Sequence, residues 1–153
     1  MMSFFPTKIL VATEGSEEAE LAATAAAEIA KGTNSELHVI HVSEPGTEIS
    51  LNPAYSLNRD LLEEPLRELE RQGRHLLNGQ VKKIEEAGGT VTEAHLRIAS
   101  RPDHEIIVLA EEIDAGMIAI GSRGFGPLKR VLMGSVSESV VRHAHCPVTV
   151  ARK

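Results

Sequence analysis

Glycine and serine residues in the last third of the sequence have the types and spacing of an anion-binding site. Gly121 and Gly124 precede Gly134 and Ser135, and nine residues lie between Gly124 and Gly134. Glycine lets backbone N–H groups approach a ligand closely because it has no Cβ. We expect Ser135 to open a helix, whose first N–H groups are unpaired and whose dipole favours an anion. A triphosphate between the two turns would therefore receive donors from both.

Two familiar phosphate-binding motifs do not fit these glycines. Gly121 and Gly126 have the spacing of a P-loop, but Pro127 and Leu128 stand where that loop requires Lys and Ser or Thr. No G-x-G-x-x-G follows the first predicted strand, which argues against a dinucleotide site of the NAD type. The spacing also indicates no Ser/His/Asp arrangement, so we expect ligand binding with slow hydrolysis at most.

A second segment with suitable chemistry, residues 13–16, follows the first predicted strand and contains Glu14. Its carboxylate is a candidate ligand contact, and the alternative is an ordinary carboxylate in a surface turn. Lys129 and Arg130 are candidates to offset phosphate charge, or else they form a solvated face. Residues 135–138 also fit a capping box, which would occupy the Ser135 hydroxyl and leave other N–H groups available.

The histidines and the single cysteine do not indicate a metal site. His143 and His145 would point to different faces of a helix, and no fourth ligand is evident. His38 and His41 would lie on opposite faces of a strand and form no pair. Cys146 cannot form an internal disulfide, which fits a reducing compartment. We therefore expect no metal ion held by protein side chains.

The elements that must position these residues alternate between strand and helix. Strands are predicted at 8–13, 36–42, 91–98, 117–120 and 147–151, with 91–98 at an edge of the sheet. One helix is predicted from Ser16, its N-cap, to a stop at Gly32, and a second over 58–87. Two further helices are predicted to begin at Pro102 and at 134–135. A long loop is predicted over 43–57. Pro65 fits only in the first turn of its helix or at a kink.

This alternation predicts an α/β fold with a parallel sheet covered by helices on both faces. Right-handed crossovers make such a sheet doubly wound. Ligands bind these sheets outside the carboxyl ends of the strands, where the strand order reverses. Both chemically suitable segments follow strands directly, so we expect them to lie at that edge.

Composition favours one globular domain and argues against nucleic acid and membranes as partners. The 153 residues are 42% hydrophobic and 25% charged, and the net charge is −6. Adjacent basic residues occur only in pairs, such as Lys129 with Arg130, whereas nucleic-acid binders usually show a basic patch. Residues 1–10 contain Lys8 within the apolar stretch and no cleavage site, so they do not resemble a signal peptide. We expect a cytoplasmic protein.

The glycine and serine spacing resembles the nucleotide signature of the universal stress protein family, in its ATP-binding branch. The resemblance covers nearly the whole chain: 9–16 resembles the family's first strand and turn, 118–124 its fourth strand and glycine turn, and 140–150 its last helix and strand. It implies one domain over 1–153 with a Rossmann-like, adenine-nucleotide-binding, five-stranded sheet of order 3-2-1-4-5. It also implies a homodimer in which residues 147–151 pair antiparallel with a second copy.

By this resemblance, ATP (or ADP or AMP) would lie with its base near the first two strands, and Mg²⁺ would be held through the phosphates. The implied nucleotide contacts are Ala12, Thr13 and Val42 beside the base, Glu14 at the base or ribose edge, and Gly121, Arg123, Gly124, Gly134, Ser135, Val136 and Ser137 along the ribose and phosphates. The family usually has Asp where Glu14 stands, Gly at Ser100 and Asp at Gly116.

The function that this resemblance implies is a stress-response protein that binds ATP as a nucleotide-dependent switch. Nucleotide would order the 43–57 loop or the dimer. Two alternatives remain open from the sequence: a dimeric interaction or scaffold protein that binds no nucleotide, and a slow Mg²⁺-assisted ATPase.

Overall fold

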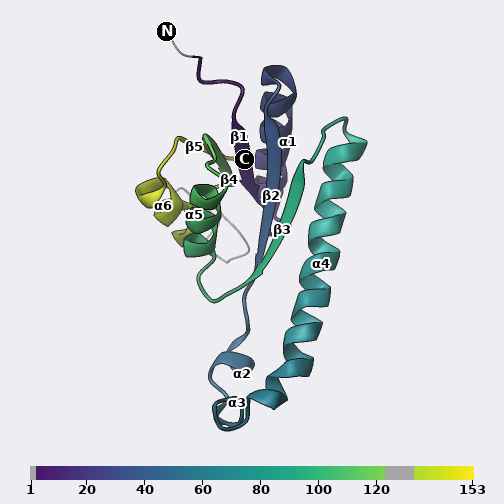
Figure 1. Cartoon of the computed structure of the whole chain (residues 1–153), viewed down its shortest axis with the longest axis vertical. Coiled ribbons are helices and arrows are strands. Elements are labelled where there is room, and N and C mark those ends of the chain that lie inside the picture. Colours follow the sequence, from purple (N-terminus) through teal and green to yellow (C-terminus); the bar gives the residue numbers. More distant parts are fainter. Residues whose placement is uncertain (1–2, 123–132) are drawn as a thin grey trace.

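Five parallel strands form the sheet at the centre of the computed structural model, which describes residues 3–122 and 133–153 (Figure 1). The strands are β1 (Lys8–Ala12), β2 (Glu36–Ser43), β3 (Glu93–Ile98), β4 (Met117–Gly121) and β5 (Val148–Ala151). Their order is β3-β2-β1-β4-β5, which confirms the expected topology and the edge position of β3.

The middle strand β1 is buried on both faces, as its continuous apolar run predicts. Ile9 and Val11 face one layer of helices, and Leu10 faces the other. Val11 pairs in register with Val39 of β2 and Ala119 of β4. Strand β1 is therefore held on both faces and both sides, and the turn that follows it starts from a well-packed position.

Two helices cover each face of the sheet (Figure 1). The helices are α1 (Glu17–Thr33) and α4 (Glu63–Glu86) on one face, and α5 (Pro102–Glu112) and α6 (Ser135–His143) on the other. Alanine residues line the buried side of α1, so this helix approaches the sheet closely. Pro102 stands in the first turn of α5 and Pro65 in the first turn of α4, as expected.

The end of α1 lies beyond the stop expected at Gly32. The helix continues to Thr33, and Asn34 follows with a left-handed φ of 58°. The Asn34 N–H donates to carbonyl groups in the last turn of the helix. Asparagine adopts this conformation more readily than most residues, so it ends the helix where a glycine was expected to do so.

The segment between β2 and α4 is helical, so the expectation of a long loop over 43–57 was wrong. It contains α2 (Thr47–Ser50), α3 (Pro53–Leu57) and the 3₁₀ helix η1 (Arg59–Leu62), and α4 begins only at Glu63. The Oδ1 atoms of Asn52 and Asn58 accept hydrogen bonds from the backbone N–H groups of Ala54 and Asp60. These Asn side chains cap the N-termini of α3 and η1. Both helices are too short to show a helical repeat of hydrophobic residues in the sequence.

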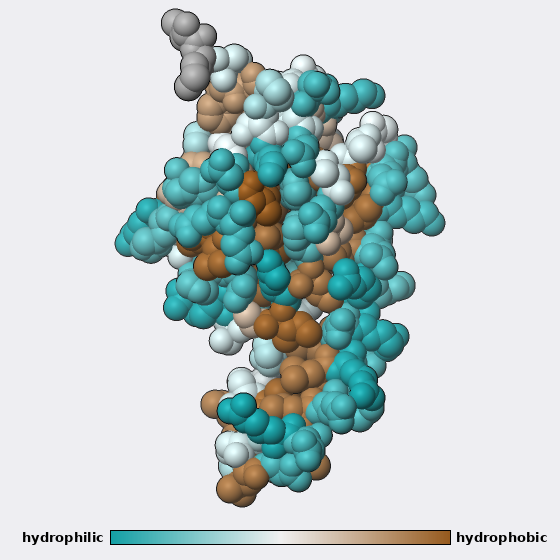
Figure 2. All heavy atoms as spheres, in the orientation of Figure 1, coloured by the Kyte–Doolittle hydropathy of each residue, from teal (hydrophilic) through white to brown (hydrophobic). Residues whose placement is uncertain are grey.

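The same segment exposes apolar side chains at the end of the molecule farthest from the N-terminus (Figures 1 and 2). Leu51 is 75% exposed and Leu57 is 87% exposed, and Leu61 is also exposed. Within the described residues, no helix combines the length and apolarity that crossing a bilayer requires.

Candidate functional site

The carboxyl ends of β1 and β4 lie side by side at the point where the strand order reverses. Leu10 pairs with Ile118, and Val11 with Ala119. The chain leaves β1 for α1 on one face and leaves β4 for α6 on the other. This is the geometry that opens a ligand crevice in doubly wound sheets.

At this edge the end of β4 bonds the start of α6 and packs closely against the start of α1, just after the predicted segment 13–16. Gly134 donates its backbone N–H to the carbonyl oxygen of Ser122 over 2.7 Å. A Cβ built on Gly121 would lie 2.8 Å from the backbone N of Ala19, at the start of α1. The end of β4 therefore contacts the first turns of both α1 and α6, and Gly121 is the residue that permits this approach.

Thr13 is buried at the end of β1 with its main chain fully engaged. Its N–H donates to Ile40 O over 2.9 Å, and its carbonyl accepts a hydrogen bond from His41 Nδ1 over 2.8 Å. Its hydroxyl oxygen is the buried polar side-chain atom that lacks a hydrogen-bond partner among the described residues. Leaving such a group unpaired costs about 1–3 kcal/mol, which a ligand bond would recover.

Glu14 folds back onto the turn that follows β1. Its Oε1 atom accepts hydrogen bonds from the Ser16 N–H over 3.2 Å and from the Ser16 hydroxyl. Burial raises the pKa of the Glu14 carboxyl, while the bonds from Ser16 and the nearby His41 oppose that rise. The Ser16 hydroxyl oxygen accepts from the Ala19 N–H, which confirms Ser16 as the N-cap of α1. Gly15 has a φ of 94°, a turn conformation that suits glycine.

The N-terminus of α6 differs from the expected capping box. Gly134 is the N-cap, and Ser135 is the first helical residue, so its hydroxyl is not placed to cap the helix. No side chain among the described residues caps α6, and Glu138 instead forms an ion pair with Arg142 at 3.0 Å. The first N–H groups of α6 thus have no side-chain acceptor there.

Ser137 fastens α6 to the end of β4. Its buried hydroxyl donates to Ser122 O at 2.8 Å, with Gly134 O as a second acceptor at 3.1 Å. The predicted contact at Ser137 is therefore occupied by the protein in this structure. Ser135 is exposed and Val136 is half-buried, so the outer side of this turn is accessible.

Two of the three expected base-flanking residues, Ala12 and Val42, lie on the α5 and α6 face of the sheet. Ala12 is in the core on that face, and Val42 of the neighbouring strand β2 packs partly buried against the same cluster. The predicted contacts Arg123 and Gly124, and the charged candidates Lys129 and Arg130, lie outside the described residues.

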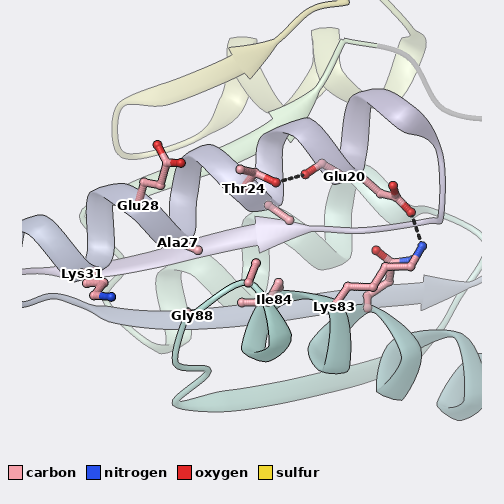
Figure 3. A pocket seen from close by; sticks show the side chains of 12 residues that line it. Glu20, Thr24, Ala27, Glu28, Lys31, Lys83, Ile84 and Gly88 are labelled. Atoms are coloured by element: carbon pink, nitrogen blue, oxygen red, sulfur yellow. Dashed lines mark hydrogen bonds and ion pairs between the residues drawn. The ribbon is translucent and has the colours of Figure 1, made fainter.

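A groove of about 260 Å³ lies elsewhere, between α1 and α4 (Figure 3). Ala27 and Ile84 line it, and an ion pair of 2.6 Å joins Lys83 to Glu20 at one end. It contains none of the residues predicted to contact a nucleotide. Among the described residues, none of its lining side chains carries a buried polar atom without a partner, whereas Thr13 does, so we assign the candidate site to the β1 and β4 edge.

One constellation was missed from the sequence: His38, Glu93 and His95 lie together on β2 and β3. From the sequence, His38 and His41 were expected on opposite faces of one strand, with no pair between them. The register between β2 and β3 places His38 opposite Glu93. Sequence alone does not give that register, and an alternation of Glu93 and His95 on a predicted strand was the one available signal.

A parallel sheet of this order, with helices on both faces, defines the class of doubly wound α/β proteins. The family model described as "Universal stress protein family" matches residues 6–152. The chain belongs to this family.

Individual relatives agree with that assignment. The chain is 36% identical over 146 residues to universal stress protein MJ0531 of Methanocaldococcus jannaschii, covering 95% of this chain and 82% of the relative. It is similar to the structure of universal stress protein UspA from Lactobacillus plantarum, with a TM-score of 0.75, 26% identity and coverage of 95% and 97%.

The fold also matches the structure of a universal stress protein from Archaeoglobus fulgidus in complex with dAMP. The TM-score is 0.63 and the identity is 24%, and the match covers 97% of this chain and 99% of the other.

Proposed function

We propose that this protein binds an adenine nucleotide, ATP or else ADP or AMP, at the carboxyl ends of β1 and β4. The observation that carries the proposal is that the end of β4 packs against the first turn of α1 and bonds the N-terminus of α6, which no described side chain caps. The Thr13 hydroxyl, which has no partner among the described residues, adds a polar group that a ligand could bond. The base would lie beside Ala12, Thr13 and Val42, and the phosphates beside Gly121 and α6.

The choice of an adenine nucleotide draws further support from the fold. A universal stress protein from Archaeoglobus fulgidus, which shares this fold, has been crystallised with dAMP. The proposed site of this chain offers main-chain donors and small side chains, which would accommodate a nucleotide without a dedicated lysine. Mg²⁺ would be held mainly by the phosphates.

Magnitudes show that several contacts must act together. A micromolar dissociation constant requires about 8 kcal/mol. One anion contact at a helix N-terminus contributes about 0.3–2 kcal/mol. The proposed affinity therefore needs burial of the base against β1 and β2 in addition to donors from both turns, with Arg123 and Gly124 completing the phosphate side.

We further propose a nucleotide-dependent switch in a cytoplasmic homodimer. Bound nucleotide would shift the packing of the 43–57 segment or of the dimer, and β5 would pair with a second copy. β5 is an edge of the sheet formed by the described residues, and edge strands present unpaired backbone groups that a second strand satisfies.

Calorimetric titration of the purified chain with ATP and Mg²⁺ tests the proposal. We expect a saturable heat with one site per chain and an upward shift of the melting temperature, because a ligand that binds only the folded state stabilises it. Absence of both heat and thermal shift at millimolar ATP would overturn it. Slow hydrolysis is tested separately by phosphate release, which should disappear in Gly124→Val.

The second candidate is an interaction protein that binds no nucleotide. The exposed leucines Leu51, Leu57 and Leu61 around α2, α3 and η1 favour it. A dimer that gives no heat with ATP in the same titration would select this candidate.

A further inference from the structure

We propose that His38, His95 and Glu93 form a transition-metal site, suited to Zn²⁺, on β2 and β3. The site is separate from the proposed nucleotide crevice. His38 and Glu93 lie at the amino-terminal ends of their strands, whereas the crevice lies at the carboxyl ends of β1 and β4. The proposal does not depend on nucleotide binding.

The parallel register brings the three side chains to one face of the sheet. His38 stands opposite Glu93, and Ile40 stands opposite His95. Residues two apart on a strand share a face, and Ile40 belongs to the core on the α5 side. His38, Glu93 and His95 therefore share that side, near the sheet edge at β3 (Figure 1).

The ligand atoms have the spacing of a common coordination sphere. His38 Nδ1 lies 3.1 Å from His95 Nε2, and the nearest Glu93 oxygen lies 3.9 Å from that same nitrogen. Zn–N bonds of about 2.0–2.1 Å in tetrahedral geometry put two imidazole nitrogens about 3.3 Å apart. All three ligand atoms lie within 4.8 Å of one another, so small rotations of the Glu93 side chain complete the set.

Glu36 provides the outer partner that metal-bound histidines usually have. The His38 Nε2 atom lies 3.2 Å from Glu36 Oε1, so Nε2–H donates to the carboxylate and Nδ1 keeps its lone pair. That tautomer directs the Nδ1 lone pair toward His95 and the proposed ion. Without metal, His95 Nε2–H donates to His38 Nδ1, and metal binding requires His95 to carry its proton on Nδ1 instead.

Burial and charge define an entry side and a metal class. The His38 and His95 side chains are 5% and 12% exposed, whereas that of Glu93 is 63% exposed, so the ion would enter past Glu93.

Two imidazoles with one carboxylate suit Zn²⁺ and related ions, while Mg²⁺ and Ca²⁺ take oxygen ligands. Three protein ligands leave a fourth position open to water. Arg97 lies two residues after His95 on β3 and carries a positive charge. It forms an ion pair with Glu112 at 3.2 Å, which reduces its repulsion of a bound cation.

Titration of the metal-free chain with Zn²⁺, without nucleotide, tests the site. We expect one Zn²⁺ per chain by calorimetry, with no displacement by millimolar Mg²⁺, and Co²⁺ should give the visible absorption bands of a four-coordinate site. His95→Gln should weaken Zn²⁺ binding at least 100-fold. Glu36→Gln, which removes only the outer partner, should weaken it 10–100-fold.

His75→Gln is the matched control, because His75 is an exposed histidine on α4 outside the cluster. It should bind Zn²⁺ as the unaltered chain does. Circular dichroism must show that each variant is folded; if His95→Gln unfolds, Glu93→Gln at the exposed ligand takes its place. Equal Zn²⁺ affinity in the unaltered chain and the folded ligand variant, or an equal loss in His75→Gln, would overturn the proposal.

Discussion

Thr13 and Glu14 follow one another at the end of β1 but differ in what they can offer a ligand. The Thr13 hydroxyl has no partner among the described residues, whereas Ser16 already donates twice to Glu14 Oε1. A ligand can therefore gain a hydrogen bond from Thr13 without breaking another. At Glu14 it must compete with the turn, so we expect this carboxylate to shape the loop more than to grip the nucleotide.

Thr13→Val separates the ligand role of the hydroxyl from its structural role. Valine has nearly the same shape and lacks the unpaired oxygen, so the free energy of unfolding of the ligand-free chain should stay equal or rise. ATP affinity should fall about 2–10-fold, which corresponds to the loss of one hydrogen bond of about 0.5–1.5 kcal/mol. Urea unfolding and calorimetry measure the two quantities. An unchanged ATP affinity would remove Thr13 from the site.

Gly121→Ala tests the close approach between β4 and α1. The added Cβ would lie 2.8 Å from backbone atoms of Glu18 and Ala19, which cannot rotate away. We expect a loss of about 1–3 kcal/mol in the free energy of unfolding, the usual cost of overpacking.

The matched control is Gly79→Ala in α4, where nothing lies within 4 Å of the new Cβ. It should stabilise the chain by about 0.5–1 kcal/mol, because alanine favours the helix. Chemical unfolding of both variants gives the comparison. If Gly121→Ala were as stable as Gly79→Ala, the packing at the candidate site would differ from that described.

Sequence reasoning found the residues of this site to different extents. The spacing of Gly121, Gly134 and Ser135 was informative because glycine and a helix start have few other uses together. The unpaired Thr13 oxygen was not predictable, since it depends on which neighbours fail to reach it. The prediction that Ser135 is the N-cap of α6 was wrong by one position, because Gly134 adopts the extended N-cap conformation. The side chain that bonds the end of β4 is that of Ser137, whose hydroxyl donates to Ser122 O.

At the scale of elements, α5 and α6 are joined by a charged hydrogen-bond network. Asp103 in the first turn of α5 accepts hydrogen bonds from Arg101 at 2.8 Å and from the Ser139 hydroxyl of α6 at 2.7 Å. These donors, Arg101 foremost, hold the pKa of the Asp103 carboxyl well below its usual range. The network thus links the helix that bears the proposed phosphate contact to its neighbour.

The lowered pKa of Asp103 gives a signed pH dependence. The pKa of Asp103 in the folded state lies below the value of about 3.9 in the unfolded state. The stabilisation is therefore complete above the unfolded-state pKa and is lost as the pH falls from there through the folded-state pKa. Asp103→Asn should therefore be less stable than the unaltered chain by about 1–3 kcal/mol at pH 7. The difference should shrink as the pH falls below about 4. Urea unfolding across that range checks the trend, and a difference that grows in acid would contradict it.

The order of strands and helices was predictable because hydrophobic runs alternated with helical periods, and the resemblance supplied the strand order. The structure of residues 43–62 was not predictable, because α2, α3 and η1 span four or five residues each and show no hydrophobic periodicity. The His38 and His95 pair depended on the β2–β3 register, which no pattern within either strand determines.

At the scale of the whole molecule, β5 is the sheet edge through which we propose that two copies pair. Pro147 O and Ala151 O accept hydrogen bonds from β4. Backbone groups alternate in direction along a strand, so those of Val148 and Val150 point outward to the free edge. These are the groups that an antiparallel partner strand would use.

Val150→Pro removes one outward N–H and leaves the residues that bond β4 in place. We expect the proposed homodimer to weaken at least tenfold, because proline cannot donate to a partner strand. Val150→Thr keeps the N–H and should remain dimeric. Sedimentation velocity over a range of concentrations measures this, and a monomeric unaltered chain or an undiminished Val150→Pro dimer would argue against pairing through β5.

The central claim is that an adenine nucleotide occupies the edge where β1 and β4 end, and amide NMR with added ATP and Mg²⁺ tests it most directly. We predict the largest chemical-shift changes at Thr13, Glu14, Ser122, Ser135 and Val136, with small changes at Ala27 and Ile84 in the groove between α1 and α4. Changes centred on that groove, or no changes at saturating ATP, would contradict the account.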